Sequence, residues 1–205
     1  MHSRQNTPVI LQAACACDEV KRRRHQSFCL LFPTQTMGLL ALADCAGSWA
    51  ESGDLACLLA LQTLLDQVAP MLLDASLMND DAYSVLLKDG AQQVHKALCS
   101  APEDYGSCSL TAIFLVGTNA YIVHAGTNRL SIAHPSLPLY QVTRDGYFVR
   151  SDNSWGILRT LGAPGYQSDA TLDAMKLSLF PGDTLLLGTG SLWRRLPEAA
   201  RDAVP

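Results

Sequence analysis

An aspartate at the end of an apolar strand is the first feature of this chain with the chemistry of a functional site. Residues 39–43 form an apolar run too short to span a membrane, and the run stops at Asp44. Cys45 and a turn of small residues follow, before apolar residues at helical spacing begin at Leu55. A carboxylate in this place suits a hard divalent cation. A thiol before a helix N-terminus has a lowered pKa, which suits a nucleophile.

Two further groups of residues have the types needed for a site. The basic run at residues 21–24 suits either a solvated turn, the favoured interpretation, or a contact with an anion. Cys15 and Cys17 alternate, so a strand would place both sulfurs on one face. That arrangement serves a metal ion or two core cysteines, and the core interpretation is favoured.

Composition limits the class of protein. The chain has 205 residues, of which 48% are hydrophobic and 17% charged, so we expect one globular domain over residues 1–205. The net charge of −4 argues against nucleic acid as a partner. We find no signal peptide and no run approaching a membrane span, and therefore expect a cytoplasmic protein without a membrane partner. In that reducing compartment all seven cysteines are expected to be free thiols.

The pattern of apolar residues predicts an α+β domain. Residues 9–17 and 26–32 are predicted to form a strand hairpin, and a helix capped by Ser52 or Asp54 should end near Pro70. A second helix is predicted at residues 82–99, with a kink or split at Asp89-Gly90. Further strands are predicted at residues 109–116, 120–124, 129–133 and 169–179, followed by a leucine strand after the turn Pro181-Gly182-Asp183. His95 is expected at the surface or its boundary, and His124 as a hydrogen-bonded histidine at a strand end.

Four motifs in this order resemble the metal-dependent protein phosphatases, the PPM or type 2C family. Residues 43–48 (ADCAGS) stand for A-D-G-M-G-G, and residues 121–129 (YIVHAGTNR) for A-Y-V-A-N-V-G-D-S-R. Residues 139–145 (LYQVTRD) and 180–193 (FPGDTLLLGTGSLW) match L-x-Q-L-T-x-D-H and x-P-G-D-x-L-L-L-C-S-D-G-L-W. The resemblance covers residues 15–195. It implies an α-β-β-α sandwich of two antiparallel sheets flanked by helices, truncated at its C-terminus.

The resemblance also implies where a metal site would lie. That family activates a water with two manganese or magnesium ions held by several carboxylates. Here Asp44 remains, and the carbonyl of Cys45 stands at the family's glycine. The other positions have changed: the acidic pair falls at His25 and Gln26, the next aspartate at Gly190, and the G-D-S-R aspartate at Thr127, between Gly126 and Arg129. Lys21, with Arg22 beside it, falls at the phosphate-binding arginine. One carboxylate cannot hold a binuclear centre.

The leading hypothesis is therefore a pseudophosphatase. This is a domain that binds or regulates a phosphoprotein or kinase in signalling, with no cofactor expected, through a cleft near Lys21, Asp44 and Arg129. The alternative is a divergent serine/threonine phosphatase with manganese or magnesium at Asp44, helped by His25 and by Asp152 from a short flap. A thiol enzyme using Cys45 ranks last, since no general base lies near it in sequence.

Overall fold

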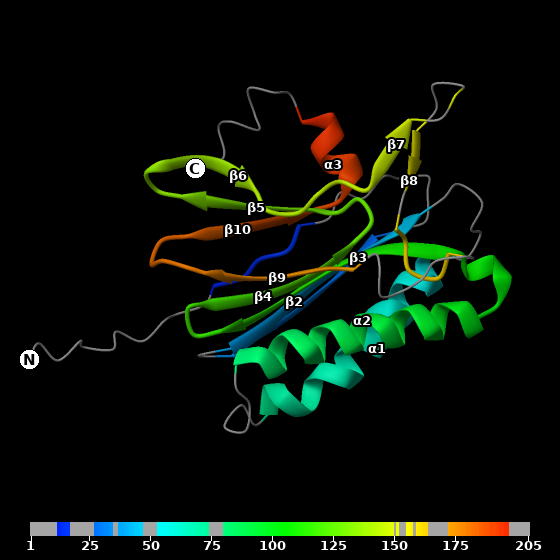
Figure 1. The fold of residues 1–205 in the computed structure, drawn as a ribbon, viewed down its shortest axis with the longest axis horizontal. Coiled ribbons are helices and arrows are strands. Elements are labelled where there is room, and N and C mark those ends of the chain that lie inside the picture. The colour runs from blue at the N-terminus through cyan, green and yellow to red at the C-terminus, as the bar shows by residue number, and fades with distance from the viewer. Residues whose placement is uncertain are drawn as a thin grey trace, which may run out of the picture.

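Two antiparallel sheets stacked face to face form the centre of the molecule in the computed structural model (Figure 1). The structure describes residues 12–16, 27–34, 37–46, 53–73, 80–149, 151, 155–157, 159–163 and 172–196. Two long helices, α1 (Gly53–Leu73) and α2 (Asp80–Ser100), cover one sheet, and the short helix α3 (Gly190–Arg195) lies beyond the other. The predicted α+β sandwich is confirmed.

Each sheet has a simple strand order. The larger sheet runs β1-β2-β3-β4-β9 and the smaller runs β10-β5-β6, while β7 and β8 form a separate hairpin. All the pairings are antiparallel. The strands are β1 (Ser27–Pro33), β2 (Met37–Ala46), β3 (Ser107–Val116), β4 (Asn119–Ala125), β5 (Arg129–His134), β6 (Leu137–Gln141), β7 (Tyr147–Val149), β8 (Trp155–Ile157), β9 (Asp173–Ser178) and β10 (Thr184–Gly188). A 3-10 turn, η2 (Glu103–Tyr105), joins α2 to β3.

Alternation along β2 divides the core into two apolar layers. Leu39, Ala41 and Ala43 are buried in the cluster beneath the helices, whereas Leu40 packs into the cluster between the sheets. In that second cluster Leu130 of β5 meets Ile113 and Ile122 of the larger sheet. Because side chains alternate in a strand, Asp44 shares the inter-sheet face of Leu40, and Cys45 shares the helix face of Ala43.

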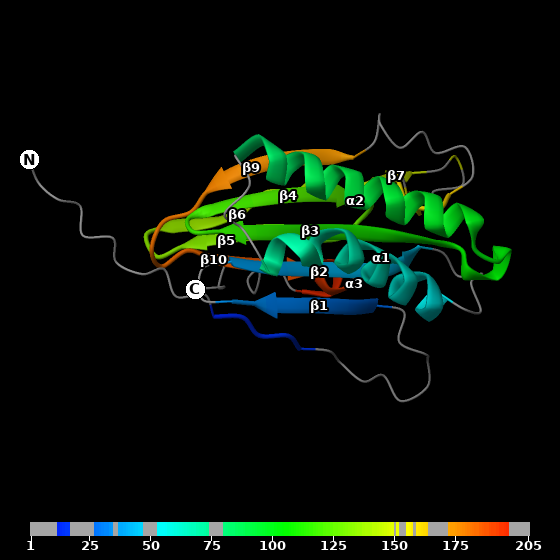
Figure 2. The same cartoon turned by 90° about the horizontal axis from the view of Figure 1, so that it is seen from below.

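Helix α1 packs one face into the fold. By length and composition alone Gly53–Leu72 qualifies as a membrane span, so the expectation that no segment approaches one is wrong here. In the fold Ala56, Ala60 and Leu64 are fully buried, and the helix contacts α2 and strands of the larger sheet (Figure 2). The apolar face that α1 turns toward the larger sheet is thus covered by protein.

Both helices run through residues that the sequence marked as breaks. Pro70 lies inside α1, which continues to Leu73, and α2 is a single helix across Asp89-Gly90. Gly90 is buried, and a β-carbon built there would lie 3.1 Å from the Leu64 Cδ1 atom. The glycine therefore allows close packing of α2 on α1, which explains why it does not act as a helix breaker.

The predicted N-terminal hairpin is wrong within the described residues. Residues 12–16 form no strand, and β1 pairs with β2, with Ser27 opposite Asp44. The expectation of seven free thiols is also wrong, because Cys15 and Cys29 form a disulfide. Cys15 is exposed and so is not a core residue. A covalent tie between distant cysteines leaves no periodic signal in sequence, so the apolar pattern alone did not indicate it.

Candidate functional site

Asp44 lies at the end of β2 in the space between the two sheets. The neighbouring strands place Ser27 on one side of it and Ser109 on the other. The Ser27 hydroxyl donates a hydrogen bond of 2.5 Å to Asp44 Oδ1. Burial raises the pKa of the Asp44 carboxyl, and the Ser27 hydrogen bond and the charge of Arg194 only partly offset that effect. The carboxylate thus sits in an environment that penalises its charge.

The turn after β4 brings Thr127 to the same place. Ser109 Oγ accepts a hydrogen bond from the Thr127 backbone N–H at 3.1 Å and lies 3.3 Å from Thr127 Oγ1. Gly126 has a φ of 98°, and a β-carbon there would lie 2.8 Å from the Ser109 Cα atom. Only glycine fits both that conformation and that approach. The turn is therefore shaped to carry a buried hydroxyl, from Thr127, toward Asp44's neighbour Ser109.

Gly190 closes the site from the first residue of α3. A β-carbon built on Gly190 would lie 2.7 Å from the Thr127 carbonyl oxygen and would collide with the Tyr147 hydroxyl. Tyr147 is placed there by β7, whose preceding residue Gly146 donates its N–H to the Gly126 carbonyl at 2.8 Å. The position where the family resemblance implies a metal-binding aspartate is thus filled by a tyrosine hydroxyl, with no room for a side chain on residue 190.

Arg194 adds a cation to this end of the sandwich. It is exposed on α3, and its guanidinium carbon lies 4.8 Å from the centre of the Tyr147 ring. This distance is typical of a cation–π contact. Its charge also acts on Asp44. Asp44, Thr127, Tyr147, Gly190 and Arg194 are linked by these contacts and charges, and we call the group the remnant cleft, a name taken from the family resemblance.

Arg129 is held on the opposite face of the smaller sheet. Leu130 points into the inter-sheet cluster, so its neighbour Arg129 points away. There Arg129 forms a two-pronged ion pair with Asp145, its Nε atom 3.2 Å from Oδ1, and lies 5.5 Å from the centre of the Trp193 ring. Trp193 Nε1 in turn donates to the Arg129 carbonyl at 3.3 Å. These contacts make Arg129 a brace between β5 and α3.

Comparison with solved structures gives this architecture its relatives. The Streptococcus agalactiae serine/threonine phosphatase superposes with a TM-score of 0.72 at 18% identity, over 88% of this chain and 79% of that one. The Mycobacterium tuberculosis phosphatase PstP gives 0.66 at 21% identity, covering 88% and 78%. PppA, a regulatory component of type VI secretion in Pseudomonas aeruginosa, gives 0.65 at 21% identity, covering 87% and 75%. No protein-family model and no curated protein sequence matches the chain.

The chain has the fold of the PPM-type serine/threonine phosphatases. At these identities the likeness establishes the fold, and function has to be argued from the site residues. The PstP structure also exists with two manganese ions bound. The residues around Gly190 do not fit a carboxylate ligand of such a centre at this position, because a β-carbon there would meet the Tyr147 hydroxyl and the Thr127 carbonyl.

Other ligands for a metal ion are not assembled among the described residues. No group of three or more His, Cys, Asp or Glu side chains in that part of the chain is arranged to hold a metal ion. Four of the residues singled out from the sequence, Lys21, Arg22, His25 and Gln26, lie outside the described residues, as does Asp152. Asp44 is thus the one predicted carboxylate ligand that the structure, within its described residues, places in the cleft.

The thiol of Cys45 does not face the remnant cleft. It packs against the cluster beneath the helices, on the face of β2 opposite Asp44. Burial raises its pKa, and the charges of Asp44 and Asp54 raise it further. Since the thiolate is the nucleophile, a raised pKa disfavours the thiol-enzyme hypothesis.

The two histidines of interest are hydrogen-bonded. His124 is buried, with Nδ1 2.8 Å from Thr111 Oγ1 and Nε2 2.9 Å from the Arg144 carbonyl. Because a carbonyl only accepts, Nε2 carries the proton and Nδ1 accepts from Thr111. His95 is half-buried, as expected of a boundary residue, and its Nδ1 accepts the Gly162 N–H at 3.1 Å.

Two residues of the cleft, Tyr147 and Arg194, and the Asp44 partner Ser27 were not singled out from the sequence. Ser27 lies beside Asp44 because β1 pairs with β2. The hairpin predicted from the sequence pairs β1 with residues 9–17 and so does not place Ser27 at the site. Tyr147 and Arg194 come from β7 and α3, far apart along the chain. Their contact depends on how those elements pack, which no local pattern encodes.

Proposed function

We propose that this chain is a PPM-fold domain that does not hydrolyse phosphate esters and instead binds a phosphorylated protein partner, or a kinase, as a regulatory module in signalling. The observation that carries the proposal is the packing of the Tyr147 hydroxyl and the Thr127 carbonyl against Gly190. Hydrolysis by two hard cations needs several carboxylates to balance the charge of the cations. The cleft contains the Asp44 carboxylate, and a tyrosine hydroxyl lies where the resemblance implies a second carboxylate, at residue 190.

The charge of the remnant cleft supports a role in binding. Arg194 is exposed beside the Tyr147 ring, and a guanidinium presents a planar fork of donors suited to phosphate oxygens. Arg129, expected near the cleft from the sequence, is already paired with Asp145. We therefore assign the phosphate contact to Arg194, with Lys21 and Arg22 as additional cations proposed from the sequence.

The proposal also covers the partner, the compartment and the cofactor. We infer a protein partner in the cytoplasm, without nucleic acid or membrane, which suits a chain with a net charge of −4. No bound cofactor is part of the proposed function. Manganese or magnesium enters in the alternative, a divergent phosphatase with one metal at Asp44.

Hydrolysis of an aryl phosphate separates the two functions. The purified chain is assayed with and without excess manganese, beside the variant Asp44→Ala. We expect no turnover above that variant under either condition. Manganese-dependent turnover that Asp44→Ala abolishes would overturn the proposal and establish a reduced but working phosphatase site.

Binding is tested with phenyl phosphate as the probe. In an NMR titration, resonances of Tyr147 and of α3 should shift, and Arg194→Ala should weaken the apparent affinity by about tenfold, the loss of roughly 1.4 kcal/mol expected for a charged hydrogen bond. Arg195→Ala, which removes an exposed neighbour on the same helix, is the matched control. Equal affinities for both variants would remove Arg194 from the site.

A further inference from the structure

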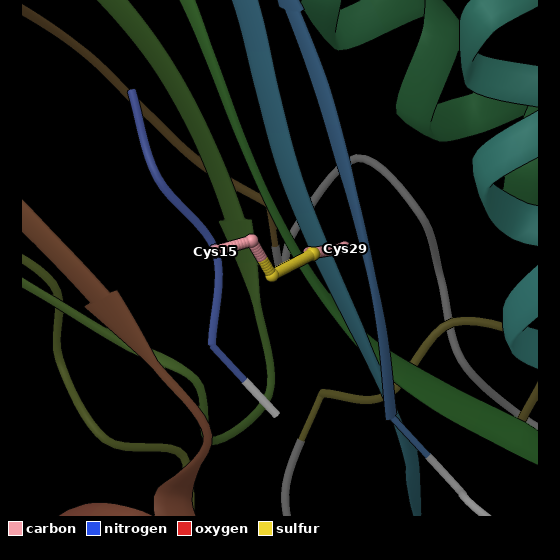
Figure 3. Close-up of a disulfide and its surroundings, with 2 residues drawn as sticks. All are labelled: Cys15 and Cys29. Carbon is pink, nitrogen blue, oxygen red and sulfur yellow. A yellow bond between two sulfur atoms is a disulfide. The ribbon is translucent and has the colours of Figure 1, made fainter. Parts of the chain in front are cut away.

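A disulfide joins the segment of residues 12–16 to the edge of the larger sheet. Cys15 lies in that segment and Cys29 lies within β1 (Figure 3). Both cysteines are exposed. Thiol–disulfide exchange requires a thiolate to reach one of the two sulfur atoms, and exposure provides that access.

Three of the four other described cysteines are shielded from this chemistry. Cys57 and Cys108 are fully buried, and burial raises the pKa of both thiols. Cys45 is free, half-buried and also shifted upward in pKa. Cys99 is a free, exposed thiol on α2. Within the described part of the chain, Cys15 and Cys29 are therefore the exposed cysteines that are already joined to each other.

The disulfide carries much of the attachment of residues 12–16. All five residues are exposed, and none belongs to a strand of either sheet. Gln12 and Ala13 line a void of about 30 Å³ together with Leu31 and Leu40, so the segment lies against β1 and β2 without filling the space beneath it. Figure 2 shows the segment running beside β1. A segment with so little buried surface has little stability of its own.

Strand β1 connects the disulfide to the remnant cleft. It is an edge strand, paired with β2 alone in its sheet. Ser27 lies two residues before Cys29, hence on the same face of the strand, and its hydroxyl holds Asp44. Edge strands open more readily than central ones, so a covalent clamp at Cys29 restrains the strand that carries Ser27.

We propose that Cys15–Cys29 is a redox-sensitive clamp, a site of thiol–disulfide exchange with a dithiol reductant, and that its reduction loosens β1 and the Ser27 side of the remnant cleft. In the reaction, a thiolate of the reductant attacks one sulfur atom and forms a mixed disulfide, releasing the other cysteine as a thiolate. The second thiol of the reductant then displaces the remaining cysteine. The protein gains two electrons and two protons, and the reductant becomes a disulfide.

This clamp goes beyond the proposed function and does not depend on it. The cytoplasm keeps most thiols reduced, and disulfides of cytoplasmic proteins are usually transient or redox-sensing. A clamp that opens and closes with the thiol balance would therefore act in the compartment proposed for this chain, whatever ligand the cleft binds.

Hydrogen exchange read by mass spectrometry tests the clamp on the full chain. The protein is equilibrated either with oxidised glutathione or with dithiothreitol, and free thiols are alkylated before peptide mapping. We expect Cys15 and Cys29 to be alkylated only after reduction, and the amides of β1 to exchange at least tenfold faster in the reduced protein. Central strand β3 should change little, because it is paired on both sides.

Variants separate the clamp from a general effect of reductant. Cys15→Ser should show fast exchange in β1 under both conditions, and Cys99→Ser should behave as the unmodified chain. Cys15 is exposed outside the sheets, so its replacement leaves the folded core intact. Alkylation of Cys15 in the glutathione-oxidised protein, or equal β1 exchange before and after reduction, would overturn the inference.

Discussion

Asp44 combines a charge, partial burial and few compensating partners. Ser27 donates to it and Arg194 stabilises its charge, yet burial is the largest influence on its pKa, which is raised. Phosphatases that hold two cations surround such a carboxylate with positive charge. Among the described residues, the guanidinium of Arg194 has that role, and the carboxylate retains part of its desolvation cost. Functional residues often carry such a cost in stability.

Replacing Asp44 by asparagine should therefore stabilise the fold at neutral pH. A folded-state pKa above the unfolded value means that stability is lost as pH rises from about 4 through the folded pKa. The amide oxygen of the new side chain would still accept the Ser27 hydrogen bond, without the charge. We expect Asp44→Asn to raise Tm at pH 7 by a few degrees, as ~1 kcal/mol does in a chain of this length, and to lose that gain below about pH 4.

Thermal unfolding followed by circular dichroism across this pH range measures the effect. Asp66→Asn is the matched control, because Asp66 is exposed on α1 and bonded to Gln62. An Asp44→Asn variant with the Tm of the unmodified chain at every pH would show that the carboxylate bears no desolvation cost.

His124 predicts a separate dependence of stability on pH. Burial lowers its pKa, with the Arg144 carbonyl opposing that shift. Between the folded pKa and the unfolded value of about 6.5, the unfolded chain binds more protons, so stability should fall as pH drops through this window. Protonation occurs at Nδ1, which then no longer accepts from Thr111, whereas Nε2 keeps its hydrogen bond to the Arg144 carbonyl.

Urea unfolding of His124→Gln at several pH values tests this account. The variant should be less stable at pH 7.5 and should lack the loss of stability as pH falls below about 6.5. His134→Gln is the control, since His134 is only half-buried. Nitrogen-15 shifts of the unmodified protein give a second readout. A ring protonated on Nδ1 at pH 7 would contradict the assigned tautomer.

At the scale of elements, the packing of α3 on β7 decides what residue 190 can be. Thr189 caps α3 by accepting the Leu192 N–H, and Arg194 lies over the Tyr147 ring. These contacts fix α3 at a distance from β7 where a side chain at position 190 would overlap Tyr147. The contact between these two elements thus leaves no space for a carboxylate side chain at residue 190.

Gly190→Asp should consequently destabilise the fold without restoring a metal site. Overpacking costs about 1–3 kcal/mol, which should lower the midpoint of urea unfolding with an unchanged m-value. Tyr147→Ala should make room, so the double variant should lose less than the sum of the two single ones. Leu192→Asp, half exposed on the same helix, is the control for adding a carboxylate to α3.

Manganese provides the opposing outcome for the same set of variants. Gly190→Asp that unfolds like the unmodified chain and gains a manganese-dependent rise in Tm would show that α3 can shift away from β7. In that case the absence of the carboxylate alone, and not the packing of Tyr147, would account for the remnant cleft.

The sequence predicted elements better than it predicted contacts between them. Strands β2 to β5, β9, β10 and both long helices follow from apolar spacing, because burial of one face sets that spacing. The role of Gly90 was misjudged because local propensity marks glycine as a breaker, whereas Gly90 is a buried helix residue whose β-carbon would lie 3.1 Å from Leu64 Cδ1. The same limit applies to the cleft: Asp44, Thr127 and Gly190 stand in recognisable motifs, but Tyr147 and Arg194 reach it through tertiary packing.

At the scale of the whole molecule, the two sheets depend on each other for burial. The smaller sheet has three strands, and its apolar face is covered by Ile113, Ile122 and their neighbours on the larger sheet. Neither face could remain exposed without a large cost in apolar surface. The helices cover the other side of the larger sheet, so the layers form a stack in which each sheet completes the core of the next layer (Figure 1).

This stacking predicts that residues 1–205 unfold as one cooperative domain. Leu130 is fully buried at the centre of the inter-sheet cluster, and its truncation in Leu130→Ala should cost about 2–5 kcal/mol. Far-UV circular dichroism, dominated by α1 and α2, and tryptophan fluorescence should report the same shifted urea midpoint, because a two-state domain loses all layers together. Leu137→Ala, at a position 65% exposed, should leave the midpoint nearly unchanged. If Leu130→Ala instead separated the two transitions, the helical layer and the smaller sheet would be distinct folding units, and Asp44 would sit at a boundary between them.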